Sequence, residues 1–127
     1  MKTKYKKNFG NYGENLSVKY LKTNGYKILD TKWSKNKREI DIVAEKDNVI
    51  HFIEVKTRKK IKKDEINEMI NEKKIKNITL AIEDYLNEKN LQQYQISLDV
   101  IIVIFANKKE YTITHYKNAY YPYNFDL

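Results

Sequence analysis

The feature that most constrains the fold is a pair of apolar, β-branched segments, residues 38–44 and 51–56, which flank a Lys-Asp-Asn sequence at residues 46–48. β-Branched residues favour strands, whereas Asp and Asn favour the tight turns of hairpins. The sequence therefore predicts a β-hairpin. If Asp-Asn is a two-residue loop, Lys46 pairs with Val49.

This pairing has a consequence for four charged side chains. Counting back along the two strands places Asp41 opposite Glu54 and Glu39 opposite Lys56. A four-residue loop keeps that register, whereas a three-residue loop would turn Asp41 to the other face. Because side chains alternate along a strand, the two-residue loop predicts that Asp41, Glu54 and Lys56 share one face.

Two like charges directly opposite each other destabilise a sheet, unless one is protonated, a cation lies between them or the face is well solvated. Two hard oxygen ligands that hold a divalent metal beside a lysine are suited to phosphodiester hydrolysis. The metal polarises the phosphoryl oxygen and lowers the pKa of a bound water, and the lysine orients that water or stabilises charge. The alternative is that Glu54-Val55-Lys56 is an exposed strand face, since 33% of the residues are charged.

Length and charge narrow the class of protein. A chain of 127 residues predicts a single domain over residues 1–127. Its 25 basic and 17 acidic residues give a net charge of +8, which favours nucleic acid as a partner and an anionic membrane surface second. The absence of cysteine excludes disulfides and fits a reducing cytosol, so we expect a cytoplasmic protein.

No apolar stretch follows the basic residues 1–7, and the longest apolar run, residues 100–106, is too short for a bilayer. We therefore expect neither a signal peptide nor a membrane span.

The remaining pattern predicts an α/β fold, a mixed central sheet of about five strands flanked by helices. Tyr12, Leu16 and Tyr20 are expected to face the core from the first helix, which Asn24-Gly25 should end. The predicted elements are helices at residues 8–24 and 64–90, the second with a break near 71–73, strands at 26–33, 96–106 and 111–116, and a basic loop at 35–38.

Several residues have two interpretations. Glu14 is either a first-turn acid stabilised by the helix dipole or a third carboxylate that leans over the hairpin. The tail from residue 118 is aromatic, and it either stacks on bases or packs on the core or a second subunit. The two histidines, His51 and His115, show no zinc-type spacing. Basic residues near the hairpin and the second helix are candidate phosphate contacts, although such residues are often only solvated. These are Lys35, Lys37, Arg38, Arg58, Lys59, Lys60, Lys62, Lys63 and Lys74.

A set of ordered motifs extends over nearly the whole chain: Gly10-Asn11-Tyr12-Gly13-Glu14, Tyr20-Leu21, Gly25-Tyr26, Arg38-Glu39-Ile40-Asp41-Ile42-Val43, Phe52-Ile53-Glu54-Val55-Lys56-Thr57-Arg58, and more weakly Lys74, Ala81, Tyr85-Leu86, Leu98-Asp99-Val100, His115 and Asn118-Ala119-Tyr120. Together they resemble the YraN family of small bacterial proteins. That family is similar in fold to Holliday-junction resolvases and restriction endonucleases, whose PD-(D/E)XK core has an aspartate followed by acid-x-lysine. The resemblance implies a restriction-endonuclease-like core.

Carried over to this sequence, the resemblance implies a nuclease-type site made of Glu14, Asp41, Glu54 and Lys56. Asp41 and Glu54 would hold Mg²⁺ or Mn²⁺, with the Val55 carbonyl as a further ligand. Lys56 would position or activate the water, and Glu14 would complete the acid cluster.

Two positions depart from the family pattern. Arg38 stands where the family usually has glycine, and it either crowds the approach to the metal or adds a phosphate contact. Ser97 stands where the family usually has arginine, so a buried ion pair is less expected there.

The expected function is that of a metal-dependent endonuclease or nuclease-like DNA-binding protein acting on structured or branched DNA. A homodimer is a reasonable hypothesis because cutting both strands requires two sites. The alternatives are a catalytically inactive nucleic-acid-binding module of the same fold, an RNA-directed nuclease, and a basic scaffold that binds a protein through its tyrosine-rich tail.

Overall fold

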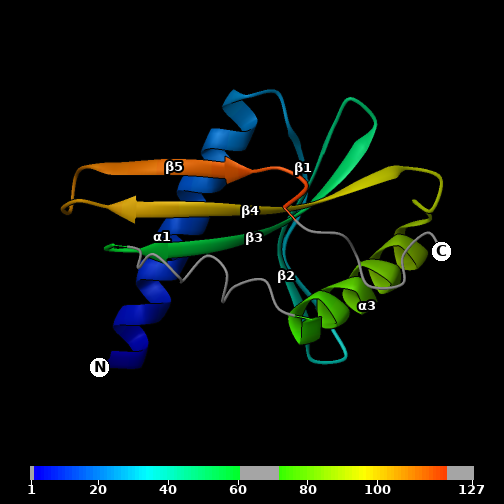
Figure 1. The fold of residues 1–127 in the computed structure, drawn as a ribbon, viewed down its shortest axis with the longest axis horizontal. Helices are drawn as coiled ribbons and strands as arrows, with labels where there is room; N and C mark the ends of the chain where they lie inside the picture. The colour runs from blue at the N-terminus through cyan, green and yellow to red at the C-terminus, as the bar shows by residue number, and fades with distance from the viewer. Residues whose placement is uncertain (1, 61–71, 120–127) are drawn as a thin grey trace.

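A computed structural model describes residues 2–60 and 72–119, with side chains at 9–60 and 74–119. In it a mixed five-stranded sheet lies between two helices (Figure 1). The elements are α1 (Lys2–Thr23), β1 (Lys27–Lys35), β2 (Arg38–Lys46), β3 (Val49–Arg58), α3 (Glu72–Lys89), β4 (Gln95–Phe105) and β5 (Tyr111–Tyr116). The predicted α/β class and five-stranded mixed sheet are confirmed, and the arrangement is compatible with a restriction-endonuclease-like core.

The strands follow the order β1-β2-β3-β4-β5, and every neighbouring pair is antiparallel except β3 and β4. A parallel pair needs a long connection, and α3 lies between these two strands in the chain. Helix α1 covers one face, where Leu21 packs with Ile53 and Ile101. Helix α3 covers the other, where Tyr85 packs with Phe52. Both faces of the sheet are therefore covered by a helix.

The predicted two-residue turn and the register beside it are confirmed, whereas the predicted pairs Asp41–Glu54 and Glu39–Lys56 lie beyond the paired residues. β2 and β3 pair from Lys46↔Val49 to Ile42↔Ile53, and the two loop residues Asp47 and Asn48 have φ angles of 51° and 65°. Positive φ at both central residues is typical of the type I′ turn that suits hairpins. The expected basic loop at 35–38 is a second turn of this kind, because Lys35 pairs with Arg38.

The first helix differs from its prediction in two ways. It begins at Lys2 rather than at residue 8, and Tyr12 does not face the core but is 47% exposed. The fully buried positions are Gly13, Ser17 and Leu21, one position further along, while Leu16 and Tyr20 are half-buried and pack against the core as predicted. Small residues at the first two positions allow the helix to approach the sheet closely, which a pattern of large apolar residues does not predict.

Gly13→Ala should destabilise the protein. A Cβ atom at Gly13 would lie 1.9 Å from Thr57 Oγ1, so the helix or the strand would have to shift. Overpacking of this kind costs about 1–3 kcal/mol, which exceeds the roughly 1 kcal/mol that alanine gains over glycine in a helix. Gly10→Ala is the matched control, because nothing lies within 4 Å of its added Cβ. Urea unfolding should therefore show that Gly13→Ala is less stable than the wild type and that Gly10→Ala is more stable. Equal stability of the two variants would contradict the close contact between Gly13 and Thr57.

Some predictions fall outside the described residues. They include the first part of the second helix, residues 64–71, and with it the start of the break expected at 71–73. They also include Lys62, Lys63 and the tail from Tyr120 onward. The strands predicted at 26–33 and 96–106 are confirmed with ends shifted by one or two residues, and the strand at 111–116 is confirmed with its predicted ends. Within the described ranges, no helix is both long and apolar enough to cross a membrane.

Candidate functional site

The candidate site lies where β2 and β3 part. Pairing between these strands extends to Ile42↔Ile53, and Asp41 is the next residue of β2. The Val55 N–H donates its hydrogen bond to the Asp41 side chain rather than to a backbone carbonyl of β2, with 2.8 Å between Val55 N and Asp41 Oδ2. Asp41 is therefore held in the gap between the two strands.

Glu14 reaches this gap from α1. Its side chain is 17% exposed, and its Oε2 lies 3.7 Å from Lys32 Nζ. Burial raises the pKa of Glu14, while Lys32 and a hydrogen bond with Asp41 act against that rise. Because α1 begins at Lys2, Glu14 lies well inside the helix, and its interpretation as a first-turn acid is wrong. It is the carboxylate that leans over the hairpin.

Asp41 has the most perturbed acidity in the site. Burial, followed by the charges of Glu14, Glu54 and Glu39, raises its pKa to about 7, although the Val55 N–H opposes the rise. A carboxyl group whose ionisation is suppressed in this way favours a nearby cation, because the cation stabilises the charged form. Such perturbed acids often mark functional sites.

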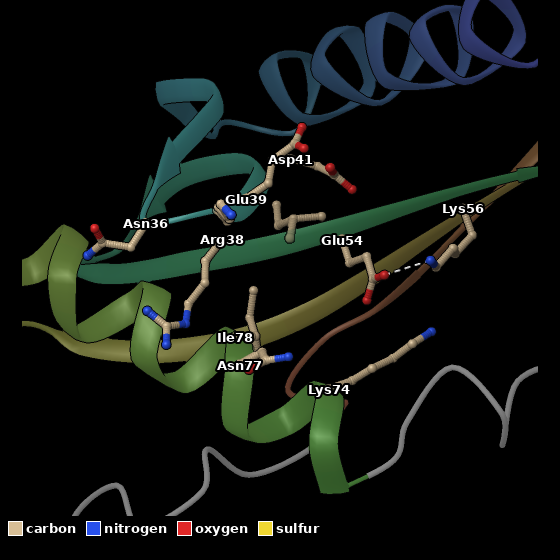
Figure 2. Close-up of a pocket in the computed structure, with 11 residues that line it drawn as sticks. Asn36, Arg38, Glu39, Asp41, Glu54, Lys56, Lys74, Asn77 and Ile78 are labelled. Atoms are coloured by element: carbon tan, nitrogen blue, oxygen red, sulfur yellow. Dashed lines mark ion pairs between the residues drawn. The ribbon is translucent and has the colours of Figure 1, made fainter. Parts of the chain in front are cut away.

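Glu54 and Lys56 lie on β3 and form an ion pair with 2.7 Å between Oε1 and Nζ. Figure 2 shows Glu54 turned toward Lys56 and the start of α3, whereas Asp41 lies on the α1 side. The predicted single-face arrangement is thus only partly realised. Asp41, Glu54 and Lys56 nevertheless line the same two cavities.

These cavities open toward different helices. The α3-side cavity, of about 480 Å³, also contains Lys37, Arg38 and Lys74. The α1-side cavity, of about 770 Å³, also contains Arg58 and Lys59. The acids therefore lie between two openings, each with cationic side chains.

Not every predicted phosphate contact is at the site. Lys35 and Lys60 line neither cavity, and Lys62 and Lys63 are outside the described residues. Lys74 is exposed, as an ordinary surface lysine would be, yet it lines the α3-side cavity. Its position fits a phosphate contact better than the sequence indicated.

The acids are not gathered around a single point. Among residues 9–60 and 74–119, the group of three metal-ligating side chains whose ligand atoms all lie within 4.8 Å is His51, Asp99 and His115. Glu54 is paired with Lys56, and Asp41 accepts the Val55 N–H, so each carboxylate has its own partner. A shared ion would require Glu54 to turn away from its lysine.

Sequence reasoning missed the network around Asp99, whose side chain has no exposed surface. Its Oδ2 accepts hydrogen bonds from His51 Nδ1 at 2.6 Å and from His115 Nε2 at 2.7 Å. Its Oδ1 accepts from Ser97 Oγ at 2.5 Å and from Asn118 N at 3.0 Å. Burial opposes ionisation of Asp99, but these donors lower its pKa far below the usual range.

The arginine that the family usually has is replaced here by Ser97, and the hydrogen-bond partners of Asp99 are Ser97 itself, His51 and His115. The signal in the sequence was Asp99 itself, an acid within an apolar strand. Tyr20 OH lies 3.2 Å from His115 Nδ1, which joins α1 to the network. The network connects β3, β4, β5 and α1, and these contacts indicate a structural role.

Comparison with known proteins is consistent with the predicted resemblance. The chain matches the family described as "Uncharacterised protein family UPF0102" over residues 13–103. It is similar to a UPF0102 protein of Clostridium perfringens, with 41% identity over 118 residues, 92% of this chain and 97% of the relative. It is also similar to UPF0102 protein FP2501 of Flavobacterium psychrophilum, with 37% identity over 114 residues, 90% of this chain and 94% of the relative. The chain therefore belongs to the UPF0102 family, the YraN family of the resemblance.

Proposed function

We propose that the protein is a metal-dependent endonuclease that cuts structured or branched DNA. The observation that carries this proposal is the desolvated carboxyl group of Asp41, with a pKa of about 7, beside two further acids and a lysine. This cluster lies between two cavities that contain cationic side chains. Phosphate neutralisation by such cations supplies most non-specific affinity for DNA, and the net charge of +8 acts in the same direction.

The donor set suits a hard divalent cation, since all the side-chain ligands are carboxylate oxygens. Asp41 and Glu54 would hold Mg²⁺ or Mn²⁺, and the Val55 carbonyl would be a further ligand. When bound, the ion would withdraw charge from the phosphate and favour deprotonation of water.

The side chains have separable tasks. Asp41 accepts the Val55 N–H of β3, and Glu14 of α1 lines the same cavity. The raised pKa of Asp41 allows it to keep a proton until a cation arrives. Lys56 is paired with Glu54, and with Glu54 as a ligand of the ion its ammonium group would be available to orient water or the phosphate.

The test is a cleavage assay on branched, duplex and single-stranded DNA and on RNA, with Mg²⁺, Mn²⁺ or EDTA. Branched DNA should be cut only when metal is present. Glu54→Gln and Lys56→Met should each lower the cleavage rate by about 10²-fold or more, because each removes a charge that acts on the reacting phosphate. Glu45→Gln, on the same hairpin but in neither site cavity, is the control and should cut normally.

Three results would overturn the proposal. Cutting that survives both substitutions would place the activity elsewhere. DNA binding that does not depend on metal, without any cutting, would identify an inactive binding module. Faster cutting of RNA than of every DNA substrate would identify an RNA-directed enzyme.

A further inference from the structure

An exposed aromatic cluster lies beside the candidate site. Phe105, at the end of β4, has ring-centroid distances of 5.3 Å to Phe9, 5.4 Å to Tyr12 and 5.7 Å to Tyr111. Phe105 is buried beneath these rings, whereas Tyr12 is 47% and Tyr111 is 41% exposed. We refer to Phe9, Tyr12, Phe105 and Tyr111 as the aromatic platform.

The platform contains two of the exposed large hydrophobic side chains. Among the described residues, the large hydrophobic side chains counted as exposed are Tyr12, Tyr111 and Tyr116. The first two contact the same buried ring, and Tyr116 lies at the opposite end of β5. Two exposed tyrosines fixed on one buried ring present aromatic surface to solvent with little freedom left to lose on binding.

The platform is continuous with the α1-side cavity. Phe9 belongs to both, and the same cavity contains Asp41, Arg58 and Lys59. In the parallel register, Arg58 pairs with Ile104, the residue before Phe105. The ends of β3 and β4 and the start of β5 therefore lie together at one end of the sheet (Figure 1). The platform therefore lies at the end of the sheet where Arg58 lines the α1-side cavity.

We propose that the platform stacks unpaired bases of a nucleic acid strand whose phosphates follow Arg58 and Lys59. Cationic side chains beside aromatic rings are the combination that holds single strands, because every base has an aromatic face. In a duplex the faces of the bases are already stacked on one another. The course of the nucleic acid strand, from the acids to the platform, rests on the proposed function. The inference specifies the substrate as DNA with a single-stranded arm, gap or frayed end at the site.

The experiment measures binding in EDTA, so that it does not depend on cleavage. Fluorescence anisotropy compares labelled oligothymidine of about 15 nucleotides with an abasic oligomer of the same length and charge, and with a duplex. The full-length wild type should bind oligothymidine about 5- to 100-fold more tightly than the abasic oligomer, as expected for one stacked base or more. Combined Tyr12→Ala and Tyr111→Ala substitutions should remove most of that preference, while Tyr111→Phe should keep it.

Tyr116→Ala is the matched control, because Tyr116 is 40% exposed on the same strand but outside the platform. It should bind both oligomers as the wild type does. Oligothymidine binding that the double substitution leaves unchanged would overturn the inference, and so would an equal loss for both oligomers. If the preference depends on Tyr12 and Tyr111 but no substrate is cut, the platform stands and the nuclease proposal fails. If branched DNA is cut and the preference is absent, only the platform proposal fails.

Discussion

Asp41→Asn should be more stable than the wild type at pH 8, although it should have lost metal-dependent cleavage. Burial and neighbouring acids raise the Asp41 pKa from 3.8 to about 7 in the folded protein. The folded chain therefore binds this proton more tightly than the unfolded chain, and stability falls as the pH rises from about 4 to about 7. Asparagine removes the charge, and its side-chain oxygen can still accept the Val55 N–H.

The size of this gain is limited by solvent. The full shift would correspond to about 4 kcal/mol, but screening at this half-buried position reduces the expected gain to roughly 1–2 kcal/mol. Urea unfolding in EDTA should show that gain at pH 8 and little of it near pH 4, where Asp41 is protonated in the folded state. Glu83→Gln, an exposed position on α3, is the control and should change little at either pH.

Metal provides the second half of the same test. Mg²⁺ or Mn²⁺ should raise the melting temperature of the wild type, because a ligand that binds only the folded state stabilises it. Asp41→Asn should show no such rise. A variant that is less stable than the wild type at pH 8, or that is still stabilised by Mn²⁺, would contradict the assignment of Asp41 as a desolvated metal ligand.

The hairpin could be predicted because its determinants are local. Asp47 and Asn48 form the turn, the turn sets the pairing Lys46↔Val49, and that pairing brings Asp41 and Glu54 to neighbouring positions. The orientation of the two carboxylates could not be predicted in this way. It depends on the separation of the strands beyond Ile42 and on contacts with α1, none of which a two-residue alternation describes.

The platform and the contact face of α1 were missed for a related reason. Large apolar residues at helical spacing predicted that Tyr12 faces inward, but the close packing of Gly13 against Thr57 rotates it outward. The glycine is visible in the sequence, but the strand that it contacts is not. The site therefore combines a locally determined hairpin with a helix whose orientation is set by tertiary packing.

The network around Asp99 leads to the largest expected change in stability. Asp99 is wholly buried and accepts hydrogen bonds from two histidine rings, the Ser97 hydroxyl and a backbone N–H. In Asp99→Asn the carboxylate charge is lost, and one of its two oxygens becomes an NH₂ group that cannot accept from the present donors. Hydrogen bonds to a charged group contribute about 1.5–3 kcal/mol each, compared with about 1 kcal/mol for a single neutral hydrogen bond, so the loss of this carboxylate should exceed the loss of any one of its donors.

Asp99→Asn should therefore unfold at a much lower urea concentration than Ser97→Ala, which removes only one donor from the same carboxylate. Because the Asp99 pKa is lowered in the folded state, its contribution is present above the unfolded pKa of about 3.8 and is lost as the pH falls through the lower folded value. The difference from the wild type should be complete at pH 7 and should shrink only in strong acid. If Asp99→Asn were no less stable than Ser97→Ala at pH 7, the buried carboxylate would not hold β3, β4 and β5 together, and the two histidines would need another explanation.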